Sequence, residues 1–108
     1  MRVLLDESLP RQLARELGGH SVRTVAQEDW CGVKNGELLL RARAAAFDAF
    51  VTADQSLQYQ QNLKDAEILV VVLAAPTNRL PDLLPLVPAL LLALESPAPG
   101  TVVRLGRK

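Results

Sequence analysis

Short runs of consecutive apolar residues recur along the chain and are separated by segments with helical spacing. Such runs lie at residues 3–5, 49–52 and 68–73, a partly alternating run spans 21–25, and a weaker one spans 101–105. A short continuous apolar run between turn residues is typical of a strand that is buried on both faces of a sheet. The pattern therefore predicts four to five strands, the last of them at a sheet edge.

Helices are predicted between these runs. Leucines recur at helical spacing over residues 9–17, and a glycine pair ends that segment. Asn35 is expected to cap a helix over residues 36–46, and a short polar helix is expected near residues 56–63. Strand and helix thus alternate, which predicts a three-layer α/β/α sandwich with a mostly parallel central sheet and right-handed crossovers. No repeat or linker divides residues 1–108, so we expect a single domain.

The leucine-rich segment after Asn78 predicts a helix that ends near Leu94. Because Pro85 and Pro88 each lack a backbone donor, this helix is expected to be kinked or to begin late. It carries more leucines than one buried face requires, so we expect it to pair with a second copy of the chain, as a homodimer, or with a partner.

Composition limits the classes of function. Among 108 residues, 12 lysines and arginines balance 12 aspartates and glutamates, and 49% of the residues are hydrophobic. This apolar fraction excludes a disordered chain, and zero formal charge excludes nucleic-acid binding through bulk positive charge. The single cysteine, Cys31, cannot form an internal disulfide, which suits a reducing cytosol. No signal peptide is expected, because acids follow the first apolar run closely, and the apolar stretch 83–94 is too short to span a bilayer. We expect a cytoplasmic protein.

Three carboxylates are expected at one edge of the sheet. Asp6 directly follows the first strand, Asp54 follows the third, and Glu37 opens the helix that leads into that third strand. Because parallel strands end at the same edge, these acids could share a divalent cation, and oxygen ligands suit Mg²⁺ or Mn²⁺. Acids are also common as caps at strand ends and in first helical turns, and spacing alone favours that explanation.

Further polar residues lie close to the same edge. Arg79, with Asn78, follows the fourth strand, and an arginine there could bind a phosphate or cap the next helix. Gln58 belongs to a polar cluster after Asp54, which could donate to a nucleic-acid backbone or simply form a solvated helix face.

Three segments in this order resemble the compact PIN-like family, short bacterial relatives of the PIN-domain ribonuclease toxins of type II toxin–antitoxin pairs. The segments are MRVLLDESLP at residues 1–10, KNGELL at 34–39 and VTADQSL at 51–57. The residues QYQQNL at 58–63 and TNRL at 77–80 also look like that subfamily. The resemblance extends over nearly the whole chain.

The resemblance implies an α/β/α sandwich and hydrolysis of RNA phosphodiester bonds with Mg²⁺ or Mn²⁺. In that interpretation Asp6, Glu37 and Asp54 are both metal ligands and catalytic residues, and a metal-bound water attacks phosphorus. It also implies a cognate antitoxin as partner. Full-length relatives carry a further acid on a middle helix, for which this chain has no room.

Two other functions fit the same residues. A receiver-like phosphoacceptor domain also places acids after the first and third strands, although it requires a lysine after the last strand, near the pocket, and the only candidate there is Lys108. A catalytically silent binding or assembly module would keep the fold and use the leucine-rich helix for its partner.

Overall fold

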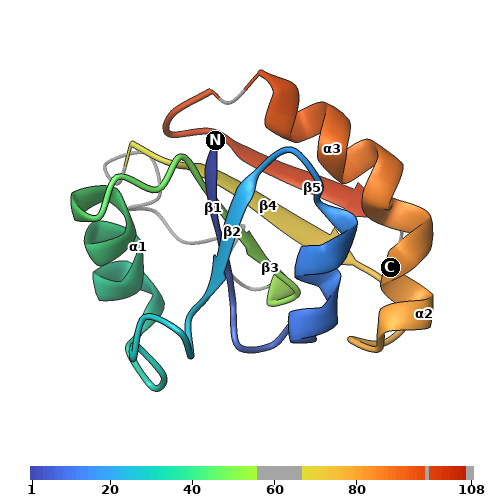
Figure 1. Ribbon diagram of the computed structural model, residues 1–108, viewed down its shortest axis with the longest axis horizontal. Coiled ribbons are helices and arrows are strands. Elements are labelled where there is room, and N and C mark those ends of the chain that lie inside the picture. Colours follow the sequence, from blue (N-terminus) through green and yellow to red (C-terminus); the bar gives the residue numbers. More distant parts are fainter. Residues whose placement is uncertain (56–66, 97, 107–108) are drawn as a thin grey trace.

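The fold is built on five parallel strands. The computed structural model describes residues 1–55, 67–96 and 98–106, and the structural statements below concern these residues. The strands lie in the order β2-β1-β3-β4-β5 (Figure 1). Their bounds are β1 (Arg2–Leu5), β2 (Ser21–Thr24), β3 (Ala49–Thr52), β4 (Leu69–Ala74) and β5 (Val102–Gly106). All four pairings are parallel, so the predicted parallel sheet of four to five strands is confirmed.

The helices lie between the strands, with some differences from the sequence pattern. Their bounds are the 3₁₀ helix η1 (Arg11–Glu16), α1 (Asn35–Ala44), α2 (Leu80–Leu83), the 3₁₀ helix η4 (Leu84–Leu86) and α3 (Val87–Glu95). The segment expected to be helical over 9–17 thus forms a shorter 3₁₀ helix. The expected cap at Asn35 is wrong by one residue, because Lys34 occupies the capping position without a side-chain cap and α1 already begins at Asn35. The polar helix expected near 56–63 lies outside the described residues.

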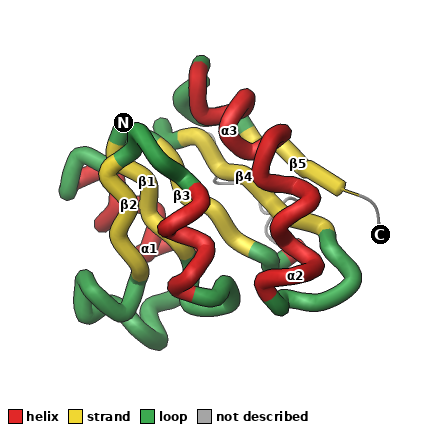
Figure 2. Tube along the Cα trace, turned by 45° about the vertical axis from the view of Figure 1, so that its right-hand side comes forward, coloured by secondary structure: helices red, strands yellow, loops and turns green. Residues whose placement is uncertain are grey.

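Alternating strand side chains divide the core between the two faces of the sheet. On one face the side chains of Val3, Leu5 and Val51 pack against leucines of η1, α2 and α3. On the other face Leu4 and Phe50 pack against α1. Helices therefore cover both faces of the sheet, as the tube view shows (Figure 2). The three-layer α/β/α arrangement explains why the central strands are apolar at consecutive positions.

The crossovers do not all have the same hand. The chain passes from β1 to β2 in one direction along the sheet through η1, and from β2 to β3 in the other direction through α1 on the opposite face. From β4 to β5 the chain moves along the sheet in the same direction as from β2 to β3. This time it passes through α2 and α3, which lie on the same face of the sheet as η1. The last crossover is therefore opposite in hand to the first two, so the expected right-handed crossovers cannot hold for all three.

The leucine-rich segment forms three short helices instead of one, and several of its leucines are buried in the core. It forms α2, η4 and α3 in succession, which confirms the expected interruption by Pro85 and Pro88. Leu83, Leu90 and Leu94 are fully buried, whereas Leu92 keeps 66% of its surface exposed. No helix in the described part of the chain has the length and apolar content that a membrane span requires. Pairing of two copies through this segment stays a prediction.

Gly106 supports a test of how closely β5 packs on β4. Its φ is +92°, and a Cβ atom there would lie 2.5 Å from the carbonyl oxygen of Ala74. We expect Gly106→Ala to lower the free energy of unfolding by about 1–3 kcal/mol, because backbone strain and a backbone clash coincide. The matched change Gly36→Ala, in α1 with nothing within 4 Å of the added Cβ, should raise it by about 0.5 kcal/mol. Urea unfolding of both variants checks this, and equal effects would contradict it.

Candidate functional site

The pairing register of the central strands brings Asp6 beside Thr52. Leu5 of β1 is paired with Val51 of β3, so the next residue of each strand lies side by side at the carboxyl ends. The Asp6 amide continues the ladder by donating to the Val51 carbonyl, at 2.9 Å. This is where the strand order reverses, since the chain leaves β1 for β2 on one side and later enters β3 on the other. Such switch points are where open parallel sheets bind ligands.

The Asp6 carboxylate is buried and held by three donors. Its Oδ2 accepts hydrogen bonds from the hydroxyls of Ser8, at 2.8 Å, and Thr52, at 2.7 Å. Its Oδ1 accepts one from the Glu7 amide, at 2.9 Å. Only 9% of the Asp6 surface is exposed, so these donors replace the water that a carboxylate would otherwise require. Because a carboxylate offers about four lone pairs, Oδ1 keeps one with which it could bind a cation.

Asp54 is connected to Asp6 through a single hydroxyl. The Thr52 Oγ that donates to Asp6 also accepts the Asp54 amide hydrogen, at 3.0 Å. The Ser8 Oγ makes a similar link, since it accepts the Ala53 amide hydrogen at 3.3 Å. Two hydroxyls thus tie the turn after β1 to the turn after β3, and two of the three predicted acids lie within one hydrogen-bonded corner.

Glu37 lies elsewhere in the described structure. It begins α1, its side chain is 61% exposed, and its carboxylate pairs with Arg41 at 2.8 Å. It lines a separate small cavity with Cys31 and Lys34. The thiol of Cys31 donates to the Glu7 carboxylate, so this loop contacts the residue next to Asp6. The interaction with Glu7, assisted by desolvation and by the charge of Asp29, raises the pKa of the Cys31 thiol.

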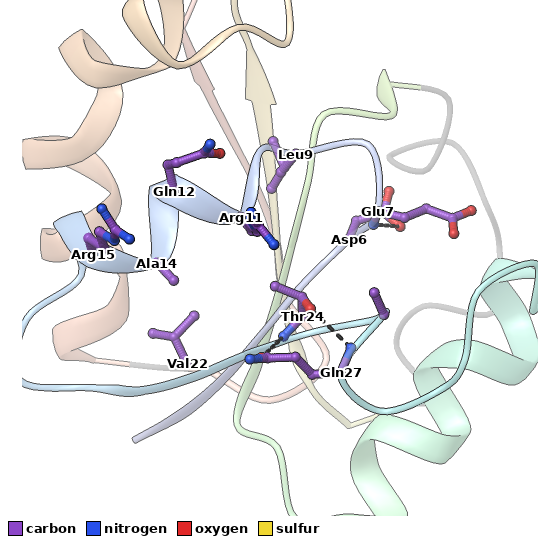
Figure 3. Close-up of a pocket in the computed structure, with 11 residues that line it drawn as sticks. Asp6, Glu7, Leu9, Arg11, Gln12, Ala14, Arg15, Val22, Thr24 and Gln27 are labelled. Carbon is purple, nitrogen blue, oxygen red and sulfur yellow. Dashed lines mark hydrogen bonds between the residues drawn. The ribbon is translucent and has the colours of Figure 1, made fainter.

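Asp6 also borders a cleft of about 630 Å³ between η1 and β2 (Figure 3). Glu7 lies beside it, and the guanidinium groups of Arg11 and Arg15 come from η1. Gln27 and Thr24 close the β2 side, where each accepts a hydrogen bond from the other's backbone amide, at 2.8 and 3.1 Å. The cleft therefore presents acids and arginines along one wall and a rigid polar turn on the other.

The donor set at the corner suits a hard divalent cation. Mg²⁺ is commonly bound through one or two carboxylates, with waters and substrate phosphates as its other ligands. Asp6 keeps a lone pair on Oδ1 for such a cation, and the backbone of Asp54 is held beside it through the Thr52 hydroxyl. Among the described residues no group of three or more His, Cys, Asp or Glu side chains could hold a metal ion, so Glu37 as a third ligand stays a prediction.

The predicted substrate-binding residues are less closely associated with Asp6. Arg79 and Asn78 are exposed in the loop after β4, and the Arg79 amide donates to the Thr77 hydroxyl at 3.1 Å. Neither lines the cleft that contains Asp6. Gln58 lies outside the described residues. A role for these side chains in binding substrate stays a prediction.

Sequence reasoning missed the two hydroxyls and the two arginines of this region. Thr52 could have been found from its position, because it stands one residue before the turn and opposite Asp6 in any in-register pairing. Ser8 carries a weak local signal, since an aspartate side chain in a turn often faces the residue two positions on, where the Ser8 hydroxyl stands. Arg11 and Arg15 stand between the leucines of the segment 9–17, as polar residues of a solvated helix side do, and only the packing of η1 beside β2 shows that they line a cleft.

The contact between Cys31 and Glu7 makes a testable prediction about thiol reactivity. Because the Glu7 carboxylate disfavours the thiolate, Glu7→Gln should lower the pKa of Cys31 and raise its thiolate fraction at pH 8. The rate of alkylation by iodoacetamide, measured as a function of pH, should then reach half its maximum at a lower pH. The control Glu16→Gln, on η1, should leave the profile unchanged, and an unshifted profile in Glu7→Gln would contradict the contact.

Comparison with protein-family models, with curated proteins and with solved structures gave no match to this chain.

Proposed function

We propose that the protein is a metal-dependent endoribonuclease of the PIN-like kind. The observation that carries the proposal is the buried Asp6 carboxylate at the switch point, joined through Thr52 to Asp54. Three donors satisfy most of the lone pairs of this carboxylate, and the one left on Oδ1 could bind a divalent cation. The sequence resemblance to PIN-like ribonucleases supports the same chemistry.

The roles of the side chains follow from their contacts. Ser8 and Thr52 donate to the same oxygen of Asp6, so they fix its plane and leave Oδ1 to face a cation. Asp6 and Asp54 would hold the cation from two sides of the switch point. When bound, Mg²⁺ or Mn²⁺ supplies a water of lowered pKa and positive charge for the phosphoryl group. Glu37 would join this site only by exchanging its contact with Arg41, whose ion pair is solvent-exposed and therefore weak.

The partners of the proposed ribonuclease follow from the same resemblance. They are an RNA substrate in the cytoplasm and a cognate antitoxin that keeps the enzyme inactive. A homodimer would use the exposed leucines of the leucine-rich segment, Leu84 and Leu92.

Cleavage of a labelled RNA by the purified protein tests the proposal. With Mn²⁺ or Mg²⁺ we expect cleavage that EDTA abolishes. Asp6→Asn and Asp54→Asn should lower the cleavage rate by at least about 100-fold, because loss of a residue that only hydrogen-bonds to a metal ligand already costs about 10- to 100-fold. Thr52→Val, which removes a donor to Asp6, should lower the cleavage rate by about 10- to 100-fold. Mn²⁺ should also raise the melting temperature of the wild type but not of Asp6→Asn.

Glu95→Gln is the matched control, since it removes an exposed carboxylate at the end of α3. It should cleave as the wild type does. Equal cleavage by Asp6→Asn and the wild type would reject the proposal. Labelling of Asp54 by acetyl phosphate, without cleavage, would favour the receiver-like alternative.

The role of Glu37 needs a separate comparison, because its present contact is an ion pair with Arg41. Glu37→Gln and Arg41→Gln break the same pair, so a purely structural role predicts equal and small effects, about 0.5 kcal/mol or less on the free energy of unfolding. If Glu37 is a ligand, only Glu37→Gln should lower the cleavage rate, by about tenfold or more. Equal cleavage rates in both variants would remove Glu37 from the site.

A further inference from the structure

The cleft beside Asp6 carries opposite charges at its two ends. Asp6 and Glu7 lie at one end and Arg15 at the other, with Arg11 between them (Figure 3). Both arginines belong to η1, and because a 3₁₀ helix rises about 2 Å per residue, their Cα atoms are separated by about 8 Å along its axis. Positive charge is thus presented beside the acid pair, along one wall of one cleft.

The charge of these two arginines is not neutralised by an acid partner in the described part of the chain. Neither has a side-chain ion pair or hydrogen bond to any described residue. Three other arginines have acid partners, namely Arg23 with Glu28, Arg41 with Glu37 and Arg43 with Glu67. A guanidinium that has no acid partner and lines a cavity can bind an oxyanion bidentately, and phosphate oxygens match its geometry.

The size and the other walls of the cleft suit an unpaired nucleotide of a single-stranded nucleic acid. Its volume of about 630 Å³ lies within the usual range for small organic ligands. It is also lined by the apolar side chains of Leu9, Ala14, Val22 and Ala26. An unpaired base could contact this apolar surface, whereas the bases of a duplex stay stacked inside the helix. No aromatic side chain lines the cleft among the described residues, so the phosphate contacts would dominate binding.

We propose that Arg11 and Arg15 form a phosphate subsite for single-stranded RNA. They bind a phosphate that neighbours the scissile one, while the scissile phosphate lies at Asp6 and Asp54. The identity of the scissile phosphate rests on the proposed ribonuclease function, but the subsite itself does not. The arginines do not touch the reacting atoms in this arrangement, so they are positioning residues that set where along the strand the reaction occurs.

Binding of a short, fluorescein-labelled, single-stranded oligouridylate in EDTA tests the subsite without cleavage. Arg11→Gln/Arg15→Gln should weaken binding at low salt by about tenfold or more, since two exposed ionic contacts are lost. The slope of log Kd against log salt should fall by about 1.4, which is the expectation for two phosphate contacts on a single strand. A matched duplex RNA should bind more weakly to the wild type and respond less to the double variant.

Arg41→Gln/Arg43→Gln is the matched control, because it removes the same charge from α1 on the opposite face of the sheet. It should leave Kd and the salt slope within about twofold of the wild type. Equal weakening by both double variants would show diffuse charge attraction and overturn the subsite. Polyglutamate serves as an acidic-peptide probe. If Arg11→Gln/Arg15→Gln loses binding to polyglutamate while its RNA binding is unchanged, the arginines form a protein-docking surface and the proposed phosphate subsite is overturned.

The two proposals fail in distinguishable ways. If the subsite exists but the protein is not a ribonuclease, RNA binding follows the arginines while no variant cleaves. If the protein is a ribonuclease without this subsite, Arg11→Gln/Arg15→Gln binds and cleaves as the wild type does. If both proposals hold, this variant raises KM by about tenfold and leaves kcat within about twofold, because the arginines contact a non-reacting phosphate. Asp6→Asn should still bind the oligouridylate, although it no longer cleaves.

Discussion

The burial of one carboxylate between two strands is the constraint on which the site depends. Of the described residues, Asp6 is the only charged one that the fold buries, and its neighbours on β3 provide a hydroxyl that meets it. A buried carboxylate without donors would be unstable, so Thr52 and Ser8 stabilise the corner as well as orient the acid. Because the same hydroxyls contact the backbone after β3, a shift of either turn would disturb both acids at once.

Much of the architecture follows from the pattern of apolar positions. The consecutive apolar residues of β1, β3 and β4 fill both faces of the sheet, which is why strands buried on both faces could be recognised. The order of the strands and the hand of the last crossover could not be predicted from this pattern. Leu83, Leu90 and Leu94 indicate that the last helices have a buried side, but the other face of β4 is equally apolar, so sequence alone does not decide which face they cover.

The site could be predicted only where chemistry and position coincide. Asp6 and Asp54 could be assigned to one edge because Asp6 follows β1 directly and Asp54 follows β3 after one residue, and strand ends meet at one edge of a parallel sheet. Glu37 shows the limit of that reasoning, since a residue in a first helical turn can face the site or, as here, pair with Arg41 one turn later on the same helix. Strand ends constrain a side chain far more tightly than helix starts do.

A chain with no net charge can still bind a polyanion if it separates its charges in space. Here three arginines are matched by acids, whereas Arg11 and Arg15 line a cleft without an acid partner among the described residues. Screening at physiological salt acts over about 8 Å, so charges on the far face contribute little to the potential in the cleft. The local arrangement, with the proposed cation site at one end and guanidinium groups without acid partners beside it, would therefore decide the position of a phosphate chain even though the formal charge of the whole protein is zero.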